Sequence, residues 1–166
     1  MADELIARFR RWFEYERDAH AKVLKSLEAV PADRRGGAEY RKAVSLLGHI
    51  VGARRIWLER LGAVPSSGNP LFPEEGADLA DVAAEWLRVA DAWDAYLSGL
   101  ADADLEREFA YQSYDGGRFR NRVEDILATL YGHSWYHRGQ IAVLVRAAGG
   151  VPAATDLVYW CREPVG

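Results

Sequence analysis

The sequence has few of the features that mark secreted or membrane-bound proteins. It contains a single cysteine, Cys161, which excludes an internal disulfide and any metal site built from several cysteines. That usage fits a reducing compartment. No apolar run approaches the ~20 residues of a membrane-spanning helix, and the N-terminus lacks a charged-then-apolar secretory pattern. We therefore expect a cytoplasmic protein that does not enter a membrane.

The chain also lacks an excess of basic residues. Its 21 Lys and Arg residues and 25 Asp and Glu residues give a net charge of −4. A nucleic-acid-binding surface usually shows a basic face, so nucleic acid is not an expected partner. The short pairs Arg34-Arg35 and Arg54-Arg55 are interpreted as solvated helix edges.

Several catalytic motifs are missing as well. The sequence has no Glu-x-x-His, which excludes the di-iron scheme of ferritin-like proteins. It has no His-Glu-x-x-His, which excludes the zinc-protease arrangement with its built-in glutamate base. A glycine-rich phosphate loop and a nucleophile elbow are also lacking, so common phosphoryl-transfer and serine-hydrolase designs do not apply.

Four stretches show the 3.6-residue apolar periodicity of amphipathic helices. They cover about residues 3–29, 38–61, 79–100 and 122–148. With 166 residues, 49% of them apolar, the chain can bury one core. The pattern predicts an all-α protein: a single domain, residues 1–166, built as a four-helix bundle.

The connections carry their own signals. Residues 62–76 are rich in Pro, Ser and Gly, which favours an ordered surface connection, with a lid as the alternative. Residues 106–121 alternate aromatic and polar side chains around Asp115-Gly116-Gly117, which predicts a short hairpin or an extended excursion. Asn121 with Glu124 resembles a capping box that would open the last long helix. Residues 155–162 are compatible with a brief closing helix.

Two histidines stand at the centre of the last long helix, in His133-Ser-Trp-Tyr-His137-Arg-Gly-Gln140. Four residues apart, they lie one turn above each other on one helix face that apolar residues continue. His49 lies on the apolar face of the second helix, followed by small residues. Each could be a satisfied core histidine, but three inward imidazoles from two helices match a metal site with an open position.

Other polar residues interrupt the apolar faces. Glu16 and His20, four apart on the first helix, either form an ion pair at a surface edge, or line a cavity or support metal ligands through hydrogen bonds. For a hydrolase they are the inward candidates for general base or proton shuttle. Gln140, close to His137, either orients a ligand or makes a helix-packing hydrogen bond. Arg138 lies off the inward face and receives no role.

These residues resemble the DinB/YfiT-like family. The matching features are Leu47-Gly-His-Ile with Trp57-Leu58, then His133-x-x-x-His137-Arg-Gly-Gln140, then Ala148-Gly-Gly-Val-Pro with Thr155-Asp156-Leu157. The resemblance implies an up-down-down-up bundle, often a homodimer. It also implies a divalent transition metal, commonly zinc or nickel, on His49, His133 and His137.

The resemblance leaves three functions open. Some relatives use the metal to transfer a low-molecular-weight thiol to an electrophile, and others are described as hydrolases. A metal on three neutral imidazoles keeps its charge and can stabilise a thiolate, or lower the pKa of bound water towards about 7. The third alternative is a metal-binding stress-response or dimerisation protein without turnover. A thiol S-transferase is the leading hypothesis.

Overall fold

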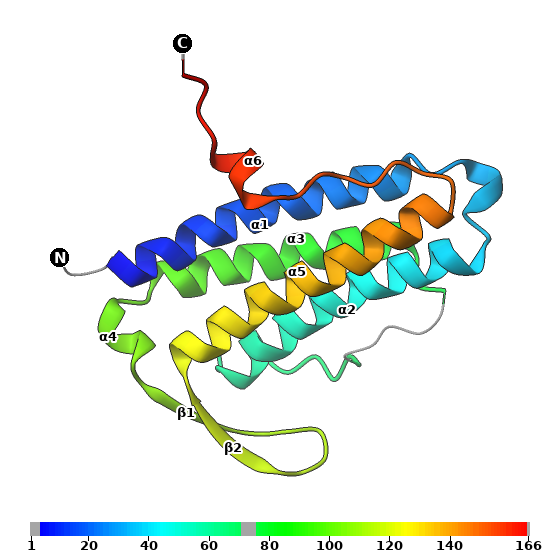
Figure 1. Ribbon diagram of the computed structural model, residues 1–166. Helices are drawn as coiled ribbons and strands as arrows, with labels where there is room; N and C mark the ends of the chain where they lie inside the picture. The colour runs from blue at the N-terminus through cyan, green and yellow to red at the C-terminus, as the bar shows by residue number, and fades with distance from the viewer. Residues whose placement is uncertain (1–3, 71–75, 166) are drawn as a thin grey trace.

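The computed structural model describes residues 4–70 and 76–165, and most of them are helical. The four long helices are α1 (Glu4–Glu28), α2 (Ala38–Arg60), α3 (Leu79–Ser98) and α5 (Val123–Ala147). Figure 1 shows them side by side, with α1 and α5 running in one direction and α2 and α3 in the other. Each helix begins and ends close to the position that the apolar periodicity predicts.

The core lies where the apolar faces of these helices meet. The α1 and α2 helices each pack against both α3 and α5, so every long helix buries its apolar face against two neighbours. The aromatic residues of α3 belong to this core, because Trp86 and Trp93 are 4% and 0% exposed. Burial of such rings removes large apolar areas from water, which is the main favourable term in folding.

A β-hairpin interrupts the helical order between α3 and α5. Strand β1 (Glu108–Gln112) pairs antiparallel with β2 (Arg118–Arg122). Gly116 takes a φ of 85° in the turn, a conformation that favours glycine. The hairpin alternative for residues 106–121 is therefore confirmed, and the two strands qualify the expected all-α class.

The predicted capping box at Asn121 is wrong. Asn121 lies in β2 opposite Phe109, and its side-chain oxygen accepts a hydrogen bond from the Tyr111 hydroxyl at 2.9 Å. Helix α5 starts after Arg122, which makes no side-chain cap. Strand pairing continues up to the first residue of the helix, so the extended backbone needed for pairing displaces the cap.

Three short helices complete the described chain: a 3₁₀ turn at Ala32–Arg34, α4 at Asp102–Leu105 and α6 at Leu157–Cys161. The last of these confirms the brief closing helix. At the start of α3, the Asp78 carboxylate accepts a hydrogen bond from the Ala80 amide at 2.7 Å, as an N-cap residue does.

The connection after α2 is anchored by Arg55. Its guanidinium donates hydrogen bonds to the Ser67 hydroxyl and to the carbonyls of Asn69 and Pro70, at 2.6, 2.9 and 3.0 Å. These bonds hold residues 67–70 against the helix. Residues 71–75, which belong to the segment considered as a lid, lie outside the described residues.

The interpretation of Arg54 and Arg55 as solvated helix edges is wrong. Their exposed fractions are 0% and 6%. Arg54 forms an ion pair with Glu16 of α1, and Arg55 forms one with Glu59 at 2.7 Å. Each buried guanidinium therefore meets a carboxylate, which the charge pattern of α2 alone does not reveal.

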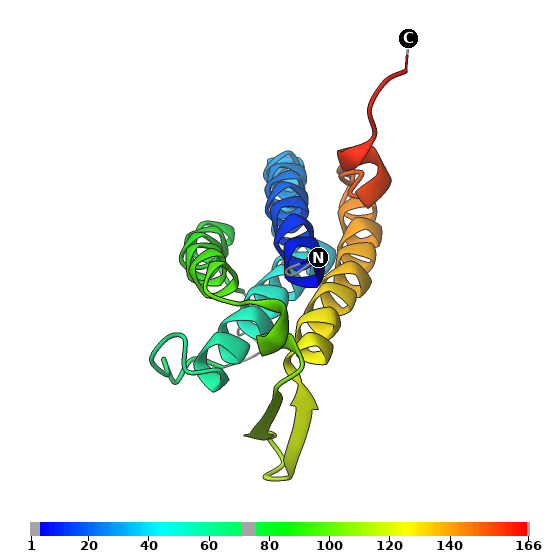
Figure 2. The same ribbon diagram turned by 90° about the vertical axis from the view of Figure 1, so that its left-hand side faces the viewer.

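The C-terminal segment crosses the outside of the long helices. Tyr15 of α1 donates a hydrogen bond to the carbonyl of Thr155, and its hydroxyl accepts one from Arg138 of α5 at 2.6 Å. The ring of Trp160 in α6 lies edge-on to Tyr15, with centroids 5.9 Å apart. Beyond α6, the chain end projects away from the helices (Figure 2). None of the helices in the described chain is long and apolar enough to cross a membrane.

Candidate metal centre

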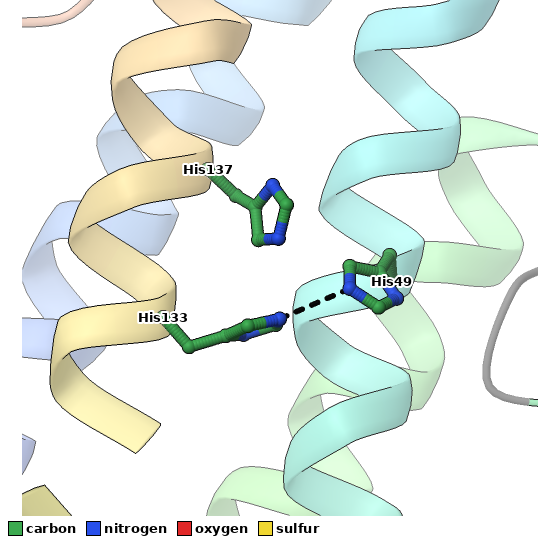
Figure 3. Close-up of side chains that lie close together, drawn as sticks. All are labelled: His49, His133 and His137. Atoms are coloured by element: carbon green, nitrogen blue, oxygen red, sulfur yellow. Dashed lines mark hydrogen bonds between the residues drawn. The ribbon is translucent and has the colours of Figure 1, made fainter. Parts of the chain in front are cut away.

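The three histidines predicted to bind a metal come together between α2 and α5. Figure 3 shows the ring of His49 reaching from α2 towards the rings of His133 and His137, which stand one turn apart on α5. The ring centroids of His49 lie 4.8 Å from each of the other two, and those of His133 and His137 lie 4.4 Å apart. The four-residue spacing and the packing of α2 on α5 together create the cluster.

The nitrogen atoms of the cluster lie close together. One nitrogen from each ring lies within 4.8 Å of the other two, and the two Nε2 atoms of His49 and His133 are 3.0 Å apart. Two ligands of a tetrahedral zinc, at bonds of about 2.05 Å, stand roughly 3.3 Å apart. The spacing of this pair is therefore close to that of two ligands on one ion, and the three side chains could hold a divalent ion of the kind that the family resemblance implies.

The protonation of His133 suits a ligand. Burial, and then electrostatic repulsion from His137, His49 and Arg54, lowers the pKa of His133 from 6.5 to about 4, because a charge on its ring would be disfavoured beside these groups. At neutral pH the imidazole is uncharged and keeps a lone pair. The two Nε2 atoms of His133 and His49 lie at hydrogen-bond distance, so one of them must carry a proton. A metal cation between the two rings would take the place of that proton.

Gln140 holds His137 in place. The side-chain oxygen of Gln140 lies 2.7 Å from Nδ1 of His137, so the ring donates its Nδ1–H to the amide oxygen. That bond leaves Nε2 of His137 as the unprotonated nitrogen. Metal-binding histidines commonly make such a bond through the nitrogen opposite the metal, because it fixes both tautomer and ring orientation.

A cavity of about 160 Å³ opens beside the cluster. His49 and His133 form one side of it, and Ala53, Ile56 and Leu130 are among the apolar residues of its wall. Ala53 leaves space next to the His49 ring, as the small residues after His49 predict. The two nearby glycines, Gly48 before His49 and Gly52 after it, line a different cavity that faces α3.

Glu16 and His20 lie elsewhere in the core. They are 1% and 0% exposed, so the surface-edge position is wrong, although Nε2 of His20 lies 3.9 Å from a carboxylate oxygen of Glu16. Glu16 accepts a hydrogen bond from Arg54, while His20 packs its ring edge-on to Trp86 with centroids 4.3 Å apart. Burial, followed by the charges of Arg138 and Arg54, lowers the pKa of His20 well below 6.5, so it stays neutral. Neither residue is among those that line the cavity at His49.

Sequence reasoning missed two arginines of the core. Arg138, predicted to lie off the inward face, is 4% exposed and points to α1, where it contacts Tyr15. The guanidinium of Arg54 lies 4.6 Å from the ring of Tyr131 and 5.4 Å from that of Trp93. For Arg54 the available signal was its inward phase on α2, which the usual surface preference of arginine outweighed.

Comparisons with known proteins identify a family and one relative. Residues 1–163 match the sequence profile of the DinB family. The chain is also similar to Protein DinB of Bacillus subtilis (strain 168), with 21% identity over 153 residues that span 87% of this chain and 88% of the relative. No solved structure matches the chain significantly. Because the profile covers nearly the whole sequence, this protein is a member of the DinB family.

Proposed function

We propose that His49, His133 and His137 hold one divalent transition metal, zinc or nickel, and that the protein is a thiol S-transferase. The observation that carries this proposal is the cluster of three imidazoles, two of which line a cavity. Three protein ligands leave a position open to a substrate, which distinguishes catalytic from structural sites. We also propose that the four long helices form the up-down-down-up bundle of the family.

The metal, when bound, would supply a Lewis acid that favours the thiolate form of a low-molecular-weight thiol at neutral pH. The protein's own residues would orient a ligand and exclude water. Gln140 orients His137 through their 2.7 Å hydrogen bond. The apolar wall formed by Ala53, Ile56 and Leu130 excludes water from the reacting sulfur.

The cavity favours thiol transfer over hydrolysis. A hydrolase needs a general base within hydrogen-bond reach of the attacking water. Among the described residues that line the cavity there is no carboxylate. Glu16, the carboxylate first considered for this task, is paired with Arg54 in the core. We therefore assign Glu16 a structural role as the partner of Arg54. We also treat His20 as a neutral residue of the core.

The first experiment is elemental analysis of untagged protein, purified without added metal, as wild type and as His49→Ala. We expect about one ion per chain in the wild type and little in the variant, because three ligands are needed to fix the ion. His20→Gln is the matched control, since it removes a buried imidazole outside the cluster and should retain the metal. Undiminished metal in His49→Ala would refute the site.

The second experiment assays the metal-loaded protein. Thiol transfer to an electrophile, lost in His49→Ala, would support the transferase. Hydrolysis of esters or amides without thiol transfer would favour the hydrolase. A stoichiometric metal with neither activity would favour a metal-binding stress-response protein. The proposal further includes a homodimer in the cytoplasm, with a small-molecule substrate as partner.

A further inference from the structure

Arg60, the last residue of α2, is surrounded by three aromatic rings. The carbon of its guanidinium lies 4.8 Å from the ring centroid of Trp57, one turn earlier on the helix. Tyr111 and Tyr114 of the hairpin approach to 5.2 Å each. Figure 1 shows why two elements meet here: the hairpin leaves the helices at the end where α2 finishes and α5 begins.

These rings hold the guanidinium without using its hydrogen-bond donors. An arginine carries five N–H groups in a planar fork, and aromatic faces attract the cation without accepting conventional hydrogen bonds. In residues 4–70 and 76–165, no carboxylate forms an ion pair with Arg60. Arg60 is thus an oriented cation without an anionic partner in the described chain.

The nearby carboxylates are already engaged. Glu59, next to Arg60 in sequence, accepts hydrogen bonds from Arg55 and from the Ser67 hydroxyl, both at 2.7 Å. On the hairpin side, Glu108 pairs with Arg120 at 3.1 Å, and Glu124 pairs with Arg122 at 2.7 Å. Each of these acids faces a different arginine, so the positive charge of Arg60 is left for a ligand.

Arg60 lines the same 160 Å³ cavity as His49 and His133. Tyr114, from the hairpin turn, also lines it, so the group that covers Arg60 belongs to the cavity wall. Ligand pockets usually measure about 300–1,000 Å³. The cavity therefore suits a small substrate, or one end of a longer one, that spans from the imidazole cluster to the guanidinium.

We propose that Arg60 binds a carboxylate of the substrate, which makes the substrate class a small carboxylate-bearing thiol. This inference rests on the proposed thiol-transferase function. The planar fork of a guanidinium matches a carboxylate with two parallel hydrogen bonds, and stacking on aromatic faces keeps that fork in one orientation. The anion would sit in a locally cationic cavity of a protein whose net charge is −4.

The test compares two thiols of equal length on cobalt(II)-loaded protein. The probes are 3-mercaptopropionate and 3-mercapto-1-propanol, and thiolate binding is followed by the sulfur-to-cobalt charge-transfer absorption. We expect wild type to bind the carboxylate probe about 10-fold to 100-fold more tightly than the alcohol, the range for a hydrogen bond to a charged group. Arg60→Gln should remove this preference, and Arg60→Lys should restore part of it.

Arg120→Gln is the matched control. Arg120 lies on the same hairpin but pairs across the strands with Ala110, on the face opposite Tyr111. Its loss should leave the preference for the carboxylate probe unchanged. Metal content, measured for every variant, separates loss of the anion site from loss of the metal site.

A second titration tests Arg60 without any thiol. Propionate is added to the zinc-loaded protein, and binding is followed by the NMR shift of the Trp57 indole N–H, because Trp57 contacts the guanidinium. We expect a saturable shift in wild type that Arg60→Gln abolishes. If this holds while neither thiol changes the cobalt spectrum, the thiol function fails and the anion site stands. Equal binding of both thiols by wild type, or the same propionate titration in Arg60→Gln, would overturn the proposal.

Discussion

The tautomer of His137 depends on one neighbouring amide. Because Gln140 accepts the Nδ1–H of His137 at 2.7 Å, it stabilises the form in which Nε2 can donate to a metal. Replacement of Gln140 by alanine should leave all three ligands present but weaken the affinity for zinc by about 10-fold to 100-fold. Competition with a chromophoric chelator measures this change.

The control for this substitution is Gln112→Ala. Gln112 lies in β1 and donates a hydrogen bond to the Gly116 carbonyl at 3.1 Å, away from the cluster. It should bind zinc as wild type does. If Gln140→Ala also binds zinc with unchanged affinity, the hydrogen bond between Gln140 and His137 does not contribute to metal binding.

The low pKa of His133 predicts how the metal-free protein responds to acid. Its pKa is about 4 in the folded state against 6.5 for the unperturbed side chain. As the pH falls below 6.5, the unfolded chain takes up this proton first, so the folded state loses stability between pH 6.5 and pH 4. His133 is partly exposed, so solvent screening reduces its effect. We expect its pKa shift to lower the free energy of unfolding by about 1 kcal/mol between pH 7 and pH 5.

Urea unfolding of metal-free protein at pH 7 and pH 5 measures this effect. The free energy of unfolding should fall less in His133→Asn than in wild type, by that amount. The comparison between variants is needed because His20, whose pKa is also lowered, acts in the same direction. An equal fall in both proteins would show that the pKa of His133 does not change on folding.

At the scale of helices, Glu16 and Arg54 join α1 to α2 through the core. Both side chains are at most 1% exposed. Removal of one partner of a buried ion pair leaves the other charge without compensation, at a cost of about 3–5 kcal/mol. Glu16→Leu should lower the free energy of unfolding by this amount, whereas Glu16→Leu combined with Arg54→Met should recover much of the loss.

The surface pair between Arg17 and Asp94 provides the comparison. It joins α1 to α3 with side chains that are 37% and 51% exposed. Asp94→Ala should cost about 0–1 kcal/mol, because water screens an exposed pair. Urea unfolding at pH 7 compares all four proteins. A Glu16→Leu variant as stable as Asp94→Ala would mean that Arg54 finds another partner or water.

The same elements show what a single sequence can predict. Apolar periodicity is a local property, so it predicted the extents of the long helices and the inward phase of His49, His133 and His137. The partner of a side chain on another helix depends on how helices pack. For that reason the pairing of Glu16 with Arg54 was missed. The aromatic cage of Arg60 also needs the hairpin to fold back on α2, which no local pattern indicates.

At the scale of the whole molecule, α5 presents an apolar outer surface. Trp135, Tyr136 and Val143 are 42%, 65% and 62% exposed. Tyr136 and Val143 lie seven residues apart on one helix face, with Gly139 between them. Exposed apolar groups gathered on one face are typical of an interaction site, which supports the proposed homodimer.

Light scattering coupled to size exclusion tests this assembly. Wild type should have the mass of a dimer, and Val143→Glu should be a monomer, because a charge would have to be buried at the interface. The exposed position of Val143 means that this substitution leaves the fold and the metal content unchanged. A wild-type monomer at micromolar concentration would contradict the dimer, as would a dimeric Val143→Glu.

The metal itself should act on the stability of the whole molecule, because its ligands come from two helices. A metal that binds only the folded state adds about 2.7 kcal/mol when its free concentration is 100 times Kd. For a chain of this size, that corresponds to a rise in Tm of roughly 5–10 °C. Calorimetry of metal-free protein, with and without zinc, measures the rise, which a chelator should reverse.

His49→Ala retains both ligands on α5 but lacks the one on α2, so its Tm should barely respond. The control His20→Gln starts from a lower Tm yet should rise as wild type does. An equal rise in His49→Ala would mean that zinc binds on α5 alone and does not link α2 to α5.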